Sequence, residues 1–203
     1  MSEVVIIDLT RAEDSSFNSA LTEQVEGYGF DVAYTPHQNL DDLRTLAQVA
    51  AAHSVIIAGV PFHYPAESAE ELESHLQPWL PITKVPTLGI CLGHQAMALA
   101  FGATMRRNIE IEKGNCVVEI ADEHRQDPLF AGLDRINAEE LHWASVSIEN
   151  TELLRLARSF PQPGSTGCEN QVIKVPGRNI YGTQFHPEKS EDGKLLLRNF
   201  LQL

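Results

Sequence analysis

The sequence Gly-Ile-Cys-Leu-Gly-His-Gln occupies residues 89–95, and its first two residues are the end of the apolar segment 85–90. The apolar segment predicts a strand and residues 95–101 predict a helix, so Cys91 falls on a sharp strand-to-helix turn. Glycines on both sides allow such a turn to close, which is typical of a nucleophile elbow with Cys in place of Ser. The helix N-terminus favours a thiolate and a nearby oxyanion. A buried structural cysteine fits this pattern equally well, so a second motif has to decide.

The second motif is Tyr-Gly-Thr-Gln-Phe-His-Pro-Glu-Lys-Ser, at residues 181–190. Residues 179–185 predict a strand, and an extended backbone would project His186 and Glu188 to the same side. Pro187 restricts the backbone between them. A cysteine nucleophile needs an imidazole to take its proton and benefits from a carboxylate that orients the imidazole. We therefore interpret Cys91, His186 and Glu188 as catalytic residues, in preference to a buried cysteine and an ordinary surface turn.

The two motifs together resemble the class I (triad-type) glutamine amidotransferases, and the resemblance spans essentially the whole chain. It implies an α/β fold and hydrolysis of the side-chain amide of glutamine through a γ-glutamyl thioester on Cys91. His186 would be the base and acid, Glu188 the orienting carboxylate, and Gln95 a residue of the glutamine pocket. The ammonia released would pass to a separate synthase subunit. We expect no cofactor and no metal ion.

A tetrahedral intermediate needs two hydrogen-bond donors at its oxyanion. The N–H of Leu92 is one candidate by its position after the cysteine. Gly59 or Val60, in the loop after the third predicted strand, would provide the other, because Pro61 has no N–H. This loop keeps a single Gly-x-Pro and so departs from the commonest forms of the family.

The segment Leu-His-Trp-Ala-Ser-Val, at residues 141–146, lies where members of the family hold the α-carboxylate of glutamine with backbone groups. Ser145 and Val146 match those positions best by register. Trp143 by itself would also explain the segment as part of a core. The resemblance therefore adds Ser145 and Val146 to Gln95 as expected substrate-binding residues.

Composition indicates one globular domain, residues 1–203, with 43% hydrophobic and 21% charged residues. The formal net charge of −13 argues against binding to nucleic acid or to an anionic membrane. The three cysteines, Cys91, Cys116 and Cys168, are odd in number and widely spaced, which favours a reducing cytoplasm over a disulfide framework or zinc site. No basic segment precedes the first apolar run, so we expect a strand there and not a signal peptide.

Strand and helix patterns alternate through the first half of the chain. Strands are predicted at 4–8, 30–34, 54–58 and 86–90, and helices at 17–25, 40–51 and 66–80. This alternation predicts a mostly parallel central sheet flanked by helices. The second half is rich in short strands, at 109–111, 116–120, 141–148, 154–160, 170–175 and 179–185, followed by a helix at 193–203. We expect these strands to form an antiparallel extension of the sheet.

Three interpretations of the function remain open. The first is a glutaminase subunit that supplies ammonia to a synthase, the second a standalone hydrolase of another γ-glutamyl amide or peptide, and the third a non-catalytic regulatory relative. The complete set of Cys91, His186 and Glu188 argues against the third, and Gln95 and the short loops argue against the second. The acceptor stays open, because residues 14–18 resemble the small subunit of anthranilate or aminodeoxychorismate synthase, whereas residues 185–190 resemble the glutaminase subunit of imidazole glycerol phosphate synthase.

Overall fold

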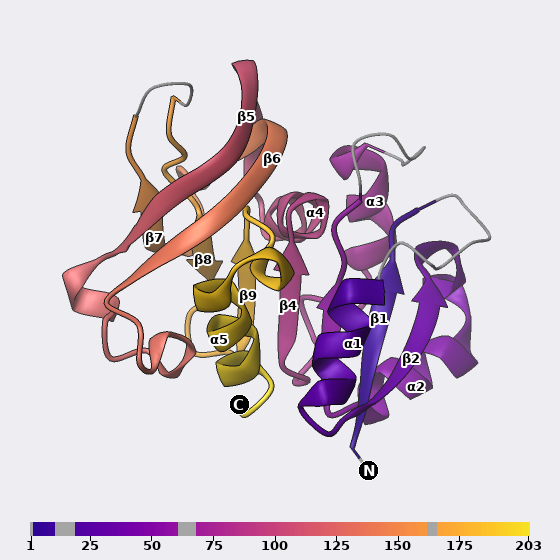
Figure 1. Ribbon diagram of the computed structural model, residues 1–203. Coiled ribbons are helices and arrows are strands. Elements are labelled where there is room, and N and C mark those ends of the chain that lie inside the picture. Colours follow the sequence, from indigo (N-terminus) through magenta and orange to yellow (C-terminus); the bar gives the residue numbers. More distant parts are fainter. Residues whose placement is uncertain (1, 11–18, 61–67, 162–165) are drawn as a thin grey trace.

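The structure is a computed structural model, and it describes residues 2–10, 19–60, 68–161 and 166–203 (Figure 1). The strands are β1 (Glu3–Asp8), β2 (Asp31–Pro36), β3 (Ser54–Ile57), β4 (Thr87–Ile90), β5 (Thr104–Ile120), β6 (Arg135–Ser147), β7 (Leu154–Ser159), β8 (Val172–Lys174) and β9 (Ile180–Thr183). The α-helices are α1 (Ser19–Gly27), α2 (Leu43–Ala51), α3 (Ala69–Leu76), α4 (Leu92–Ala100) and α5 (Glu191–Phe200). Four short 3₁₀ helices of the described residues are η2 (His37–Asp41), η3 (Asp122–His124), η4 (Pro128–Phe130) and η5 (Pro187–Lys189).

The described strands form one sheet with the order β2-β1-β3-β4-β9-β8-β7-β5-β6. The pairs from β2 through β9 are parallel, and the pairs from β9 through β6 are antiparallel. The expected fold class, a mostly parallel sheet with an antiparallel extension, is therefore confirmed. The decisive pairing joins β4 to β9 with Ile90 opposite Thr183, because it brings the ends of two strands distant in sequence to one edge.

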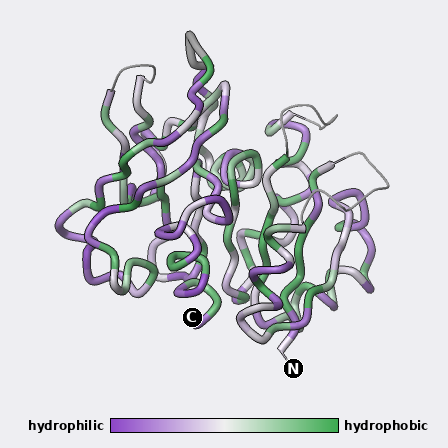
Figure 2. The backbone as a smooth tube through the Cα atoms, viewed as in Figure 1, coloured by the Kyte–Doolittle hydropathy of each residue, from purple (hydrophilic) through white to green (hydrophobic). Residues whose placement is uncertain are grey.

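Helices cover both faces of the parallel half, and a separate apolar core lies against each face. One core contains side chains of α1 and α5, and the other contains side chains of α2, α3 and α4. Residues 4–7 are fully buried, as expected of a parallel strand that is covered on both faces. Figure 2 shows the hydrophobic residues concentrated along these inner strands. Within the described part of the chain, no helix is both long and apolar enough to span a membrane.

Two predicted helices are shorter in the structure, and each begins directly after a capping residue. The helix expected at 40–51 begins as α2 at Leu43, since Asp42 is extended and its side chain accepts a hydrogen bond from the N–H of Thr45. The helix expected at 66–80 is α3, which Ser68 and Glu71 start with a capping box. Its first two expected positions, 66 and 67, lie outside the described residues, as do 17 and 18 of the first expected helix.

The antiparallel half differs more from expectation. The separate strands predicted at 109–111 and 116–120 are parts of one long strand, β5, whose register with β6 shifts between Arg107 and Glu112. β6 begins at Arg135 and is also longer than expected. Figure 1 shows β5 and β6 as a long twisted ribbon at the edge of the sheet. The sequence pattern indicated only the apolar parts of these strands. Their polar parts are held in the strand by hydrogen bonds to the neighbouring strand, which no local pattern shows.

Candidate functional site

Cys91 lies on the turn between β4 and α4, as the cap residue of the helix, with φ 50° and ψ −105°. Positive φ is strained for a residue that carries a Cβ, and such strain is concentrated at functional sites. The flanking glycines are required by packing, since a Cβ on Gly93 would overlap the carbonyl oxygen of Ile57. A Cβ on Gly89 would lie 2.7 Å from the carbonyl oxygen of Gly93. The turn thus holds the thiol at the carboxyl end of β4, beside the N-terminus of α4.

His186 and Glu188 reach the same place from the end of β9. The N–H of Cys91 donates to the carbonyl oxygen of Thr183 at 2.8 Å, and the N–H of His186 donates to the carbonyl oxygen of Glu139 at 3.0 Å. Nδ1 of His186 lies 2.7 Å from Oε1 of Glu188. The expected extended backbone is wrong here, because Pro187 starts the 3₁₀ helix η5. This turn folds Glu188 back onto the imidazole of His186.

The electrostatics of the site favour charged forms of His186 and Glu188. Burial opposes the imidazolium form, but the charge of Cys91 and hydrogen bonds to Cys91 and Glu188 raise the pKa of His186 to about 10. Burial also opposes the ionised carboxylate, yet the hydrogen bond and charge of His186 hold the pKa of Glu188 below its usual value. Because Glu188 binds Nδ1, Nε2 is the ring nitrogen that can exchange a proton with the sulfur.

Two of the expected oxyanion residues, Leu92 and Gly59, lie beside Cys91. Leu92 is the first residue of α4, so its N–H has no acceptor within the helix. Gly59 lies against both reactive side chains, since a Cβ there would be 2.9 Å from Cε1 of His186 and 3.3 Å from Cβ of Cys91. Val60 follows it and is half-buried, whereas residue 61 lies outside the described residues.

Two of the expected substrate-binding residues, Ser145 and Val146, lie on β6. Val146 is only 2% exposed, packs in the core, and its carbonyl oxygen accepts a hydrogen bond from Nδ2 of Asn170 at 2.8 Å. Leu141 is the residue of β6 that contacts Cys91, with 3.7 Å between its carbonyl oxygen and Sγ. Ser145 is four residues further along β6, which corresponds to about 13 Å of extended strand. Ala144, which precedes Ser145, contacts Gln95, and the assignment of Ser145 and Val146 to the α-carboxylate of glutamine stays a prediction.

Gln95 does lie next to the reactive residues, and it contacts two protein groups. Its Nε2 donates to the carbonyl oxygen of Ala144 at 2.7 Å and to Oε1 of Gln184 at 3.1 Å. Nε2 of Gln184 in turn lies 3.9 Å from Sγ of Cys91. Sequence reasoning missed Gln184, although its place two residues before His186 on an extended segment is a signal that could have found it.

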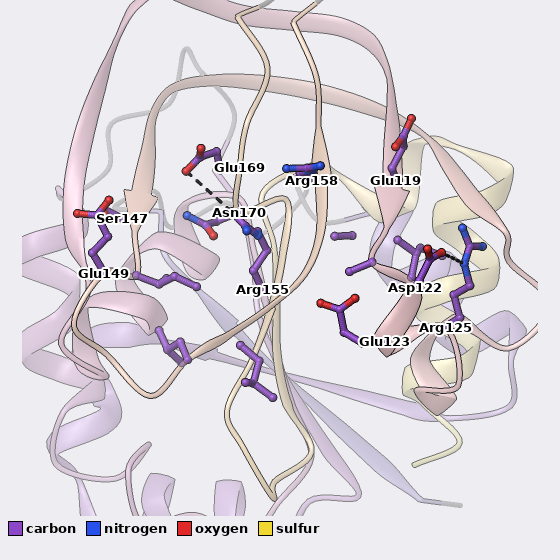
Figure 3. A pocket seen from close by; sticks show the side chains of 16 residues that line it. Glu119, Asp122, Glu123, Arg125, Ser147, Glu149, Arg155, Arg158, Glu169 and Asn170 are labelled. Carbon is purple, nitrogen blue, oxygen red and sulfur yellow. Dashed lines mark hydrogen bonds and ion pairs between the residues drawn. The ribbon is translucent and has the colours of Figure 1, made fainter.

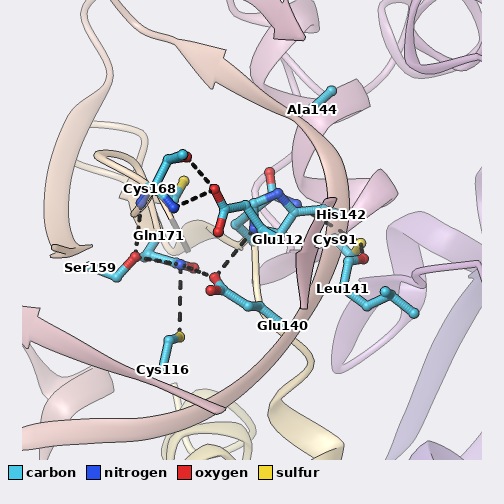
Figure 4. Close-up of polar contacts among 12 residues, drawn as sticks. Cys91, Glu112, Cys116, Glu140, Leu141, His142, Ala144, Ser159, Cys168 and Gln171 are labelled. Carbon is cyan, nitrogen blue, oxygen red and sulfur yellow. Dashed lines mark hydrogen bonds and ion pairs between the residues drawn. The ribbon is translucent and has the colours of Figure 1, made fainter. Parts of the chain in front are cut away.

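The two other cysteines belong to a buried polar cluster between β5, β6 and β8, which Figure 4 shows. Oε2 of Glu140 accepts from Nε2 of Gln171 at 2.7 Å and lies 3.3 Å from Nε2 of His142. Burial raises the pKa of Cys116 well above its ordinary value and that of Cys168 to about 12. Buried thiols of this kind stay protonated and unreactive.

A groove of about 860 Å³ lies on the antiparallel half, away from the cysteine (Figure 3). Charged side chains of both signs line it, among them Glu119, Asp122, Arg125, Arg155 and Arg158. The cavity beside His186, lined also by Gly59 and Glu188, is smaller, at about 200 Å³. Within the described ranges, no group of three or more His, Cys, Asp or Glu side chains is arranged to hold a metal ion. The cavity beside His186 is the better candidate for a catalytic site than the larger groove, because it is lined by His186 and Glu188.

Comparison with known proteins agrees with this geometry. The family model described as glutamine amidotransferase class-I matches residues 9–203. A subunit of the glutamine-hydrolysing GMP synthase from Saccharolobus solfataricus is 30% identical over 189 residues, which cover 91% of this chain and 92% of that protein. The glutamine-hydrolysing GMP synthase of Symbiobacterium thermophilum is 36% identical over 151 residues, which cover 71% of this chain but only 28% of that protein.

Among solved structures, a glutamine amidotransferase from Thermotoga maritima superposes with a TM-score of 0.72 over 99% of this chain and 96% of that one, at 19% identity. This similarity supports the fold. The two relatives described above by their sequence identity are GMP synthase proteins. They differ from the synthases that residues 14–18 and 185–190 resemble.

Proposed function

Because the chain belongs to the class-I glutamine amidotransferase family, we propose that it hydrolyses the side-chain amide of glutamine with Cys91 as the nucleophile. One observation supports this most directly. Nδ1 of His186 is hydrogen-bonded to Oε1 of Glu188 at 2.7 Å, and the imidazole is close enough to Cys91 for the charge of the sulfur to raise its pKa. This is the arrangement that an activated cysteine nucleophile needs.

In the proposed reaction, Sγ of Cys91 attacks the amide carbon, and the carbonyl oxygen takes the electron pair of the C=O bond. His186, which holds the proton of the thiol, passes it to the departing nitrogen, so that the C–N bond breaks and ammonia leaves a γ-glutamyl thioester. Water then adds to the thioester carbonyl while His186 takes its proton. The C–S bond breaks, sulfur regains its electron pair, and glutamate is released, while Glu188 keeps the imidazole oriented throughout.

The oxyanion of both tetrahedral intermediates is assigned to the N–H of Leu92 and to an N–H of Gly59 or Val60. The N–H of Leu92 lies at the positive end of α4, where negative charge is stabilised. Gly59 supports the assignment by its closeness to both Cys91 and His186. No part of this scheme requires a cofactor.

Gly59→Ala is expected to lower glutamine hydrolysis by roughly 10- to 100-fold, because the new Cβ displaces the imidazole of His186 from the sulfur. The loss should appear mainly in kcat, measured by glutamate release. Gly27→Ala is the matched control, since a Cβ at Gly27 meets no atom within 4 Å. Full activity of a folded Gly59→Ala protein would show that the ring is not held where the structure places it.

We propose further that the ammonia passes to a separate synthase subunit of the GMP synthase type. The similarity to the GMP synthase subunit of Saccharolobus solfataricus supports this choice, because it extends over nearly the full length of both chains. We take residues 1–203 as a single glutaminase domain, since all described strands belong to one sheet. The three free, buried cysteines support a reducing cytoplasm as its location.

The test of this function is glutamate and ammonia release by the purified chain, first by itself and then with the synthase subunit of GMP synthase from the same genome. We expect slow hydrolysis by the chain without a partner, at least tenfold faster hydrolysis with the partner, and transfer of the amide nitrogen of glutamine into GMP by the synthase subunit. Fast turnover that no synthase changes would favour a standalone hydrolase. Absence of turnover and of labelling by a glutamine-mimicking electrophile, with and without the partner, would favour a regulatory relative.

A further inference from the structure

The side chain of Gln184 is buried beside the sulfur of Cys91, on a backbone that the sheet holds in place. Gln184 follows β9 directly and is fully buried. Its N–H donates to the carbonyl oxygen of Gln171 at 2.9 Å, and the preceding Thr183 accepts from the N–H of Cys91. The distance between Nε2 of Gln184 and Sγ of Cys91 is therefore set by two neighbouring parallel strands and not by a free loop.

The hydrogen bonds around Gln95 determine which end of the Gln184 amide faces the sulfur. The carbonyl oxygen of Ala144 can only accept, so the atom of Gln95 that lies 2.7 Å from it must be the donor Nε2. The same Nε2 lies 3.1 Å from Gln184, and the atom that it meets must be the acceptor Oε1. Nε2 of Gln184, a donor, is then left pointing at the sulfur of Cys91, 3.9 Å away.

Two groups that touch Sγ of Cys91 have opposite preferences for its protonation state. The carbonyl oxygen of Leu141, at 3.7 Å, can accept a hydrogen bond only from the protonated thiol. The N–H of Gln184 donates to sulfur, and a donor binds a thiolate more strongly than a neutral thiol. A Gln184 amide turned the other way would present an oxygen to the thiolate and oppose its formation.

We propose that Gln184 is a further catalytic residue, which donates an N–H to the thiolate of Cys91, and that Gln95 is a positioning residue that orients Gln184. The inference rests on the proposed function only in taking Cys91 as the nucleophile, and it gives Gln95 the support of the sulfur in addition to its expected place in the glutamine pocket. Gln184 contributes twice in the reaction. It stabilises the thiolate before attack, and it stabilises the thiolate again when the C–S bond of the thioester breaks.

The test follows alkylation of Cys91 by iodoacetamide against pH, without glutamine, with the adduct on the Cys91 peptide quantified by mass spectrometry. In Gln184→Leu we expect the midpoint of the rate profile to rise by about 0.5 to 1 pH unit, since one hydrogen bond to the thiolate is lost. Below the midpoint this is roughly a three- to tenfold slower reaction. In Gln184→Glu the midpoint should rise further, because a carboxylate repels the thiolate.

Gln95→Met tests whether Gln95 acts through Gln184. We expect a smaller rise of the midpoint in the single variant and no additional rise when Gln95→Met is combined with Gln184→Leu. Gln95→Met that raises KM for glutamine but leaves the midpoint unchanged would confine Gln95 to the glutamine pocket and overturn its positioning role. Folded Gln184 variants with an unchanged midpoint would overturn the role of Gln184.

Since Gln184 is buried, a measurement on the unaltered protein complements the variants. The ¹⁵N and ¹H signals of its side-chain amide should shift as Cys91 ionises, and this shift should vanish in Cys91→Ser. An amide signal that stays constant through the alkylation midpoint would contradict the contact. Alkylation and NMR need no turnover, so a chain that shows these effects yet releases no glutamate, with or without the synthase partner, would contradict the proposed function and leave the contact between Gln184 and the Cys91 thiolate standing.

Discussion

Replacing Cys91 by Ala is expected to abolish glutamine hydrolysis, with a residual rate about 10⁴-fold or more below that of the unaltered chain. No other thiol can substitute, because Cys116 and Cys168 are buried in the polar cluster and burial raises the pKa of both. The measurement is glutamate release, together with mass spectrometry after treatment with a glutamine-mimicking electrophile. Cys116→Ala is the control and should keep its activity. An adduct on Cys116 or Cys168 would overturn the assignment of the nucleophile.

The backbone of Cys91 has φ 50° and ψ −105°, a conformation that is strained for any residue with a Cβ. The stability of variants at this position can therefore be used to test the turn. At an ordinary position, Ala is more stable than Gly by about 0.5–1 kcal/mol. At residue 91 we expect the order to be inverted, with Cys91→Gly more stable than Cys91→Ala by about 1 kcal/mol, since glycine relieves the backbone strain. Urea unfolding of the two inactive variants measures the difference. The usual order, Ala above Gly, would show that the turn carries no strain.

Glu188→Gln is expected to lower kcat by about 10²- to 10⁴-fold with little change in the overall fold. The amide is uncharged, so it no longer stabilises the imidazolium, and it can turn its NH₂ towards Nδ1 and favour the wrong tautomer of His186. Glutamate release with saturating glutamine measures the loss. Glu191→Gln is a matched control on the exposed start of α5, where Glu191 pairs with Lys194 at 2.6 Å, and it should leave kcat unchanged. An equal loss of kcat in both variants would contradict the assignment of Glu188 as the carboxylate that orients His186.

The pH dependence of stability provides an independent readout for this replacement. The pKa of His186 is raised to about 10 in the folded chain, above about 6.5 for an unfolded histidine. Protonation of His186 therefore stabilises the fold fully below about pH 6.5, and this contribution is lost as the pH rises towards 10. In Glu188→Gln the pKa of His186 should fall, so that its free energy of unfolding changes less between pH 7 and pH 10. An identical pH dependence in both proteins would contradict the charge pairing.

Several features could be predicted from the sequence because they depend on local chemistry. The Gly-x-Cys-x-Gly pattern predicts the sharp turn at Cys91, since only glycines permit the close approach of neighbouring backbone. The continuous apolar run at 4–7 predicts a strand covered on both faces. Both features are decided within a few residues of the chain. The catalytic roles of Cys91, His186 and Glu188 stay predictions that the experiments above address.

Other features depend on which segments become neighbours, and here the sequence was insufficient. The single long strand β5 follows from its pairing with β6, which forms on folding. The helix caps at Asp42 and Ser68 and the turn at Pro187 are local, but apolar spacing alone did not reveal them. The sequence also did not show which residue of β6 lies beside the sulfur of Cys91, and in the structure this residue is Leu141. Sequence spacing along β6 does not reveal where the strand passes Cys91.

By itself the sequence determined the chemical groups and the turn that presents the thiol, because those depend on residue type and on backbone freedom next to Cys91. Only the tertiary structure decided that β9 lies beside β4, with Ile90 opposite Thr183. That pairing brings His186 and Gln184 to the sulfur across about ninety residues of chain. The physical reason is that strand pairing depends on the packing of the whole sheet, and no local pattern around either motif specifies its neighbour.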